Sequence, residues 1–215
     1  MNLFLRFAIV IFSLVFVSGC ETAYFNTMEK VGIHKRDILI DRIESTQSAQ
    51  QDAQEEFMSA LDHLRTIHDF DGGDLESFYD KMNDRYEDSE AAANEIVERI
   101  EKVESVADAL FDEWQDEIKL YSSAKFKRES QGKLNATKKR FKRLMASLNR
   151  SQNAMTPVLN SLRDNTLYLK HNLNARAIVS LKSELQSIDS DITRLIADMQ
   201  KSIKESDGFI AELNN

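Results

Sequence analysis

The sequence predicts an all-α protein: an elongated antiparallel coiled-coil bundle of about four long helices that follows a cleaved signal peptide. Only six glycines and one proline occur in 215 residues, and because turns draw heavily on these two residues, few chain reversals are expected. The 42% hydrophobic and 30% charged composition is typical of a folded chain. Apolar residues recur at heptad spacing without sustained alternation, which favours helix over strand.

The first nineteen residues have the pattern of a signal peptide. Arg6 precedes an apolar run at residues 7–17, which is shorter than the roughly 20 residues needed to cross a bilayer. We therefore expect residues 1–19 to be removed and residues 20–215 to form one periplasmic domain. An ordinary signal peptide with a chance cysteine and an uncleaved anchor are the alternatives.

The tetrapeptide that ends at Cys20, Val-Ser-Gly-Cys, resembles the lipobox of bacterial lipoproteins. The resemblance implies that the Cys20 sulfur takes a diacylglyceryl group, that a peptidase cuts before Cys20, and that the new amine is acylated. Two or three acyl chains anchor a protein stably. In such lipoproteins an Asp after the cysteine commonly retains the protein in the inner membrane. Glu21 stands there instead, so we expect the inner leaflet of the outer membrane, facing the periplasm.

Two helices are predicted before residue 126, at about residues 24–69 and 74–125. The Gly72-Gly73 pair separates them, and Asp74 is placed to cap the second helix. In the first helix the heptad positions are Ile40, Ile43, Gln47, Gln50, Gln54, Phe57, Leu61, Leu64 and His68. In the second they are Leu75, Tyr79, Met82, Tyr86, Ser89, Ala93, Ile96, Ile100, Val103, Ala107, Leu110, Trp114, Glu117 and Tyr121.

Two more helices are predicted at about residues 133–172 and 175–213. Their heptad positions are Leu134, Phe141, Met145, Leu148, Met155, Leu159, Leu162, Leu169 and Leu173, followed by Ile178, Leu181, Leu185, Ile188, Ile192, Leu195 and Met199. Residues 122–133 contain several weak helix formers, so the second helix is expected to end within them. Pro157 is expected to kink or break the third helix, because an interior proline lacks the N–H that the helix needs.

Glutamines at residues 47, 50 and 54 interrupt the first apolar stripe. If the first two helices fold back on each other at the glycine pair, these glutamines fall near Ser89 and Ala93. Such a polar layer lowers stability while fixing the register of the helices.

Charge is distributed unevenly along the chain. Residues 74–117 contain sixteen acidic and four basic side chains, whereas residues 119–150 contain eleven basic ones and Glu129. The simplest interpretation is that opposite edge charges select the antiparallel pairing of the second and third helices. The alternative is contact with anionic lipid head groups or lipopolysaccharide phosphates through a basic cluster formed by Lys138, Lys139, Arg140, Lys142 and Arg143.

The sequence contains no motif that indicates an enzyme. It lacks a phosphate-binding glycine loop and a nucleophile elbow, and its four histidines do not share the i, i+4 spacing of metal ligands on one helix face. The group His68, Asp69 and Asp71 is better explained as a solvated helix end. We expect no enzyme, cofactor or metal, and the net charge of −8 disfavours nucleic acid as a partner.

Three segments resemble a family of bacterial lipoproteins, the domain of unknown function 2959 group. They are residues 28–39 (MEKVGIHKRDIL), 155–159 (MTPVL) and 169–177 (LKHNLNARA). The resemblance covers nearly all of the mature chain and implies an envelope protein of Gram-negative bacteria, without an activity. The polar segment with Lys170, His171, Asn172, Asn174 and Arg176 is the candidate partner surface, and a capped helix-helix turn is the alternative interpretation.

These expectations together predict a lipid-anchored structural, scaffold or interaction protein of the cell envelope. Its partners would be the membrane, through acyl chains on Cys20, and another envelope protein, and a homo-oligomer is compatible with the pattern. The alternative function is lipid or membrane binding through the basic third helix.

Overall fold

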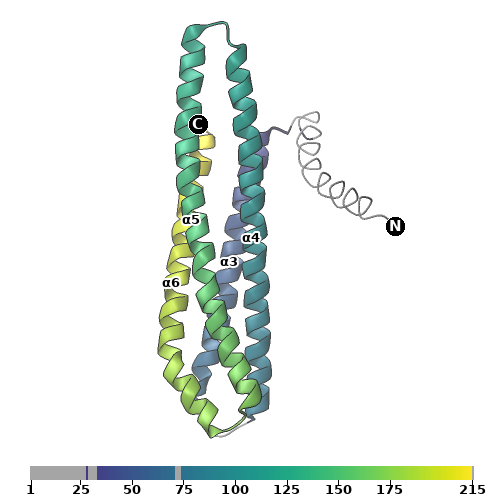
Figure 1. The fold of residues 1–215 in the computed structure, drawn as a ribbon, viewed down its shortest axis with the longest axis vertical. Helices are drawn as coiled ribbons and strands as arrows, with labels where there is room; N and C mark the ends of the chain where they lie inside the picture. Colours follow the sequence, from purple (N-terminus) through teal and green to yellow (C-terminus); the bar gives the residue numbers. More distant parts are fainter. Residues whose placement is uncertain (1–27, 29–32, 71–73, 215) are drawn as a thin grey trace, which may run out of the picture.

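The computed structural model describes Met28, residues 33–70 and residues 74–214, and within them the protein is an elongated four-helix bundle (Figure 1). The helices are α3 (Lys35–Arg65), α4 (Leu75–Leu120), α5 (Ala124–His171) and α6 (Ala175–Leu213), and a short 3-10 helix, η1 (Thr66–Asp69), follows α3. This part of the chain contains no strand. The predicted all-α bundle is therefore confirmed.

The helices run alternately up and down around one core. Helix α3 packs against α4 and α6, and α5 packs against the same two helices from the opposite side. Short connections join sequence neighbours, as expected for an up-down-up-down bundle. At 1.5 Å per residue, the 48 residues of α5 span roughly 70 Å, so the molecule is a rod.

The core consists mainly of the predicted heptad residues. The largest fully buried side chains are Phe57, Leu39, Ile43, Leu61, Leu64, Ile67, Met82, Ile96, Ile118, Leu134, Leu144 and Leu148. Near the end of α4 the heptad prediction is wrong, because Ile118 is buried while Glu117 and Tyr121 are exposed. The burial continues at seven-residue spacing from Phe111, one position away from the predicted stripe.

A polar layer crosses the middle of this core. Gln50 is completely buried, and its Nε2 donates to Ser151 Oγ at 2.9 Å and to Ser202 Oγ at 2.6 Å. Arg99 of α4 contacts Ser45 of α3. Because these two helices are antiparallel, Gln50 lies roughly level with Ala93, its predicted neighbour. The glutamine therefore lies at the expected level, but its hydrogen bonds cross to α5 and α6.

Side-chain caps begin three of the helices. Asp74 accepts from the backbone N–H of Glu76 at 3.1 Å and of Ser77 at 3.2 Å, which confirms the predicted cap of α4. Ser123 caps α5, and Asn174 caps α6. These caps satisfy amides that have no partner within their own helix.

Two of the long helices begin at other residues than expected. Helix α5 begins at Ala124 rather than near residue 133, because only residues 121–123 are needed for the reversal after α4. Helix α3 begins at Lys35 rather than near residue 24, after the extended N-cap residue His34. Residues 24–27 and 29–32 lie outside the described part of the chain.

Pro157 does not break α5, which continues through it to His171. Proline removes one backbone donor, whose acceptor would be the carbonyl of Asn153. Both Pro157 and Asn153 lie on the exposed face of the helix, where water can hydrogen-bond to that carbonyl. The buried neighbours Met155 and Val158 hold the helix against the bundle on either side.

The α4–α5 end of the rod is only two helices thick. Helices α4 and α5 extend beyond the start of α3 and the end of α6 (Figure 1), and the pairs Lys35–Glu113 and Arg140–Glu212 mark where the other two helices stop. Beyond that level, Trp114 Nε1 donates to Ser130 Oγ at 2.9 Å. None of the described helices has an apolar stretch long enough to cross a bilayer.

Candidate functional site

Cys20, the predicted lipidation site, lies outside the described residues. The position where the chain enters the bundle is nevertheless described. Lys35, the first residue of α3, is buried, and its Nζ lies 3.1 Å from Glu113 Oε1 on α4. The segment that leads from Cys20 therefore joins the rod at the end where α4 and α5 project.

The predicted basic cluster lies on α5, close to that same end. All five of its side chains are exposed. Arg140 forms an ion pair with Glu212 of α6, and Lys138 Nζ lies 5.6 Å from the centre of the Phe111 ring on α4. Arg140 thus pairs with α6 rather than with the acidic helix α4, which the edge-charge interpretation had favoured.

A groove lies beside this cluster, where α3 begins and α6 ends. Its volume is about 650 Å³, and it opens to solvent. Leu110, Trp114 and Leu213 line its apolar part, and Arg36 and Arg140 lie at its edge. Its charged lining is mainly cationic, so the groove suits an anionic or apolar group better than a cation.

The predicted partner surface forms the connection between α5 and α6 at the opposite end. Asn174 Oδ1 accepts from the N–H of Arg176 at 3.0 Å, and Asn172 Nδ2 donates to the Tyr168 carbonyl at 2.8 Å. Both asparagines therefore stabilise the turn, as the capped-turn interpretation predicts. Lys170, His171 and Arg176 are exposed around them, and the exposed fraction of Leu173 is 46%.

Contacts between helices close the bundle at this distal end. Lys182 Nζ on α6 donates to the His68 carbonyl of η1 at 3.0 Å. His63 stacks on Phe78 with ring centres 4.5 Å apart, and its Nε2 lies 3.1 Å from the Phe78 carbonyl oxygen. Burial lowers the pKa of His63, and the cationic Lys81 and Arg85 lower it further, while the bond to Phe78 opposes them.

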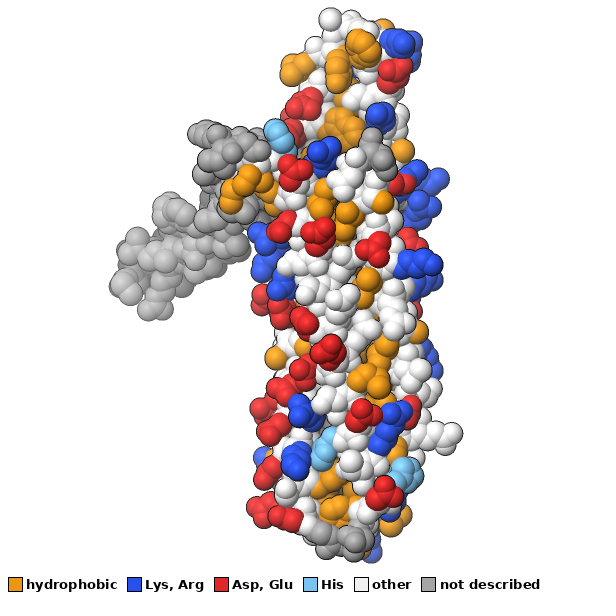
Figure 2. Space-filling model, turned by 180° about the vertical axis from the view of Figure 1, so that it is seen from behind, with side chains coloured by type: hydrophobic (Ala, Val, Ile, Leu, Met, Phe, Trp, Pro, Cys, Tyr) orange, Lys and Arg blue, Asp and Glu red, His pale blue; other side chains and the backbone are white. Residues whose placement is uncertain are grey.

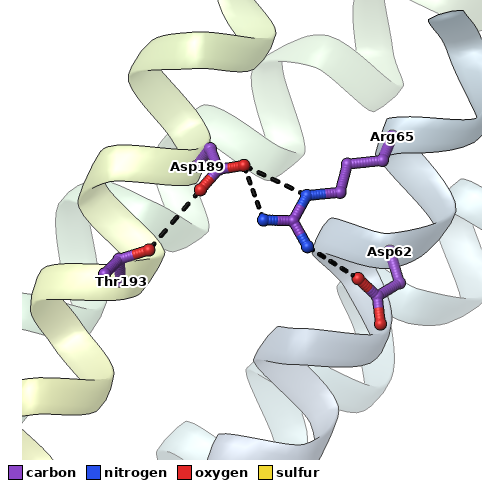
Figure 3. A network of polar contacts seen from close by, with 4 residues as sticks. All are labelled: Asp62, Arg65, Asp189 and Thr193. Carbon is purple, nitrogen blue, oxygen red and sulfur yellow. Dashed lines mark hydrogen bonds and ion pairs between the residues drawn. The ribbon is translucent and has the colours of Figure 1, made fainter.

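An ionic network joins α3 to α6 just above this end (Figure 3). Arg65 donates from Nε and Nη2 to Asp189 Oδ2 at 3.0 and 2.7 Å, and from Nη1 to Asp62 Oδ1 at 2.9 Å. These hydrogen bonds raise the pKa of Arg65 above its ordinary value. The guanidinium spans two helices that are far apart in sequence, so its role is to fix their relative position.

Two of the three residues considered for a metal site lie in the described part of the chain. His68 and Asp69 belong to η1, whereas Asp71 lies outside the described residues. No group of three or more His, Cys, Asp or Glu side chains suited to a metal ion occurs among the residues that the structure describes.

The sequence interpretation missed one surface. Leu120, Tyr121 and Phe126 are exposed around the connection between α4 and α5, with exposed fractions of 83%, 45% and 56%. Hydrophobic, basic and acidic side chains lie together at this end of the molecule, at the top of Figure 2. The available signal was the pair of apolar residues Leu120 and Tyr121 immediately before Ser122 and Ser123.

The chain belongs to a family whose model is described as a protein of unknown function, DUF2959, and the match covers residues 24–213. This confirms the family resemblance of the three sequence segments. No curated protein and no solved structure is significantly similar to the chain.

Proposed function

We propose that this protein is a lipid-anchored component of the bacterial cell envelope that holds a binding surface away from the membrane. Two features support the anchor: an apolar run precedes Cys20, and Cys20 is the only cysteine of the chain. The anchor would join the rod near Glu113, where α3 begins. The anchor would insert in the periplasmic leaflet of the outer membrane.

The observation that carries the proposal is the separation of the two ends. The connection between α5 and α6 lies at the end of the bundle opposite to the start of α3 (Figure 1), and the 31 residues of α3 alone span roughly 45 Å. Four exposed side chains lie at this far end of the rod: Lys170, His171, Leu173 and Arg176. A scaffold or interaction role needs such a surface, presented beyond the lipid head groups.

Metabolic labelling with a palmitate analogue tests the anchor. We expect the full chain to be labelled and to fractionate with membranes, and the Cys20→Ser variant to lose the label. Labelling that survives in Cys20→Ser, or an unlabelled wild-type chain, would contradict the anchor.

In-cell crosslinking tests the surface. A photoreactive amino acid at His171 is expected to give a discrete crosslinked product. The matched control is the same group at Glu98, exposed midway along α4, which is expected to give no such product. Equal products at both positions, or none at His171, would argue against a specific partner at this turn.

The exposed basic cluster on α5 favours a second candidate function, direct lipid binding through the third long helix. Lys139, Lys142 and Arg143 project to solvent near the anchor end, and each cation near an anionic surface contributes about 1 kcal/mol. A chain that begins at Glu21 contains every residue of the bundle. Salt-sensitive co-sedimentation of this chain with anionic vesicles would support this candidate if the binding is lost in the variant Lys138→Glu/Lys139→Glu/Lys142→Glu.

A further inference from the structure

The end formed by α4 and α5 alone carries a cluster of large exposed apolar side chains. We call residues 118–128 the hairpin tip. Tyr121 and Phe126 lie on opposite sides of the reversal with ring centres 6.5 Å apart, and Leu120, 83% exposed, precedes them. Exposed apolar groups gathered at one place are typical of a protein or membrane contact.

The charge within residues 118–128 is positive, and acidic residues flank this segment: Asp116 and Glu117 precede it, and Glu129 follows it. Residues 118–128 contain four basic side chains and no acidic one: Lys119, Lys125, Lys127 and Arg128. Lys119 pairs with Asp116 at 2.6 Å and Lys125 with Glu129 at 3.9 Å, while Lys127 and Arg128 form no ion pair within the described part of the chain. Long basic side chains beside aromatic and aliphatic ones fit the boundary between lipid head groups and acyl chains.

The distal end also carries exposed apolar and basic side chains. Leu167, Tyr168, Leu173 and Val179 are exposed around the α5–α6 turn, beside Lys170 and Arg176. The acidic residues Asp69, Asp74 and Glu76 lie at the same end of the bundle, around the connection of α3 to α4. The two ends differ in thickness, because only α4 and α5 reach the hairpin tip (Figure 1).

The position of the hairpin tip is compatible with contact to the membrane of the proposed anchor. The chain enters the bundle at Lys35, level with Glu113, and α4 continues for seven residues beyond that level, or roughly 10 Å. Fourteen residues separate Cys20 from Lys35, which allows a reach of at most roughly 50 Å. A membrane that holds Cys20 is therefore within reach of the hairpin tip.

We propose that the hairpin tip docks on an anionic phospholipid surface. Leu120, Tyr121 and Phe126 enter the head-group region, and Lys125, Lys127 and Arg128 lie against the lipid phosphates. The inference rests on the proposed lipid anchor for its cellular setting and for the argument from position, whereas the contact itself uses the residues of the tip. It holds the rod upright, with the α5–α6 turn facing away from the membrane.

Vesicle flotation of the chain that begins at Glu21 tests the apolar part of this contact. The vesicles are phosphatidylcholine with roughly one part in four phosphatidylglycerol, or phosphatidylcholine alone, and binding is expected only to the former and to weaken with salt. The variant Leu120→Ser/Tyr121→Ser/Phe126→Ser is expected to bind at least about tenfold more weakly. The matched control is Leu167→Ser/Tyr168→Ser/Val179→Ser, which removes three exposed apolar side chains near the other end and is expected to bind like wild type.

Charge reversal tests the electrostatic part. Lys125→Glu/Lys127→Glu/Arg128→Glu is expected to weaken binding on the order of 100-fold. Reversal of Lys138, Lys139 and Lys142 also changes three charges of α5 and is expected to have a much smaller effect. A larger loss from the second variant would assign lipid binding to the basic cluster and overturn the proposal for the tip.

Tryptophan fluorescence locates the contact, because Trp114 is the only tryptophan of the chain. In a Trp114→Phe background, Phe126→Trp is expected to shift its emission to the blue on vesicle binding and to be quenched by brominated lipid. Tyr168→Trp in the same background is the control and is expected to do neither. Circular dichroism of each variant confirms that the helices are retained.

Three results would overturn the proposal: no binding to anionic vesicles, equal binding by the tip and control variants, or a dimer in the absence of vesicles that only the tip variants dissociate. The last result would assign the tip to a second copy of the chain. None of these measurements depends on acylation of Cys20 or on a protein partner, so their failure is distinguishable from failure of the proposed function.

Discussion

The two ends of the rod are built differently. At the distal end all four helices finish together, and contacts such as Lys182 to the His68 carbonyl and His63 to Phe78 close the bundle. At the other end α4 and α5 continue alone, and Leu120 and Phe126 stay in solvent. Phe78 therefore stabilises the fold at the distal end, whereas Leu120 and Phe126 at the other end are available for binding.

Matched truncation of two phenylalanines should give the largest difference between the ends. Phe78 is 6% exposed and contacts His63 and Phe70, so Phe78→Ala is expected to lower the free energy of unfolding by about 3 kcal/mol. Phe126→Ala removes a side chain that is 56% exposed and is expected to change it by less than about 0.5 kcal/mol. Urea denaturation followed by circular dichroism measures both, and equal losses would contradict the comparison.

The polar layer between the two ends should give the next largest effect. Gln50→Ala removes the buried amide that bonds Ser151 and Ser202 and is expected to cost about 2 kcal/mol in the free energy of unfolding. The two hydroxyls keep bonds to the Leu148 and Met199 carbonyls, which limits the cost. Gln50→Leu is the volume-matched control, and a loss as large as that of Gln50→Ala would show that the hydrogen bonds, rather than packing, dominate.

The ionic network of Figure 3 should contribute less. Arg65 and Asp189 are both partly solvent-exposed, and such pairs contribute about 0.5–1 kcal/mol. A double-mutant cycle of Arg65→Ala and Asp189→Ala in low salt measures this coupling, and it should shrink at high salt. Coupling that is insensitive to salt would contradict a solvent-screened pair.

We expect the smallest effect from pH, again at the distal end. Because the pKa of His63 is lowered in the fold, the unfolded chain binds its proton first as pH falls. The stabilisation is therefore complete above the unfolded pKa near 6.5 and is lost as pH decreases from there toward the folded pKa. His63→Gln should flatten this part of the stability profile relative to wild type, and a profile that His63→Gln leaves unchanged would show that another group titrates.

The heptad pattern predicted the helices well because one physical requirement, burial of a continuous stripe, governs nearly the whole chain. It predicted that Gln50 lies inside the bundle but not that its partners are Ser151 and Ser202, because a stripe identifies the buried face and not the helices across the core. Asp74 was predictable as a cap from local chemistry alone.

The hairpin end was the least predictable part. Ser130 and Gly132 are weak helix formers, so residues 122–133 were expected to contain the end of a helix. In the fold, Ser130 accepts a hydrogen bond from Trp114, and Gly132 has open space around it, so the helix tolerates both. Tertiary contacts between α4 and α5 thus outweigh local propensity, and the reversal moves to residues 121–123.

One measurement tests the difference between the two ends most directly. Because Cys20 is the only native cysteine and would be acylated, a single new cysteine at Phe126 or at Leu173 can be labelled with a fluorophore in the full-length protein on anionic vesicles. Energy transfer to a membrane dye is expected to be strong from position 126 and weak from position 173, roughly a rod length away. Equal transfer from both positions, or stronger transfer from position 173, would contradict a rod whose hairpin tip faces the membrane.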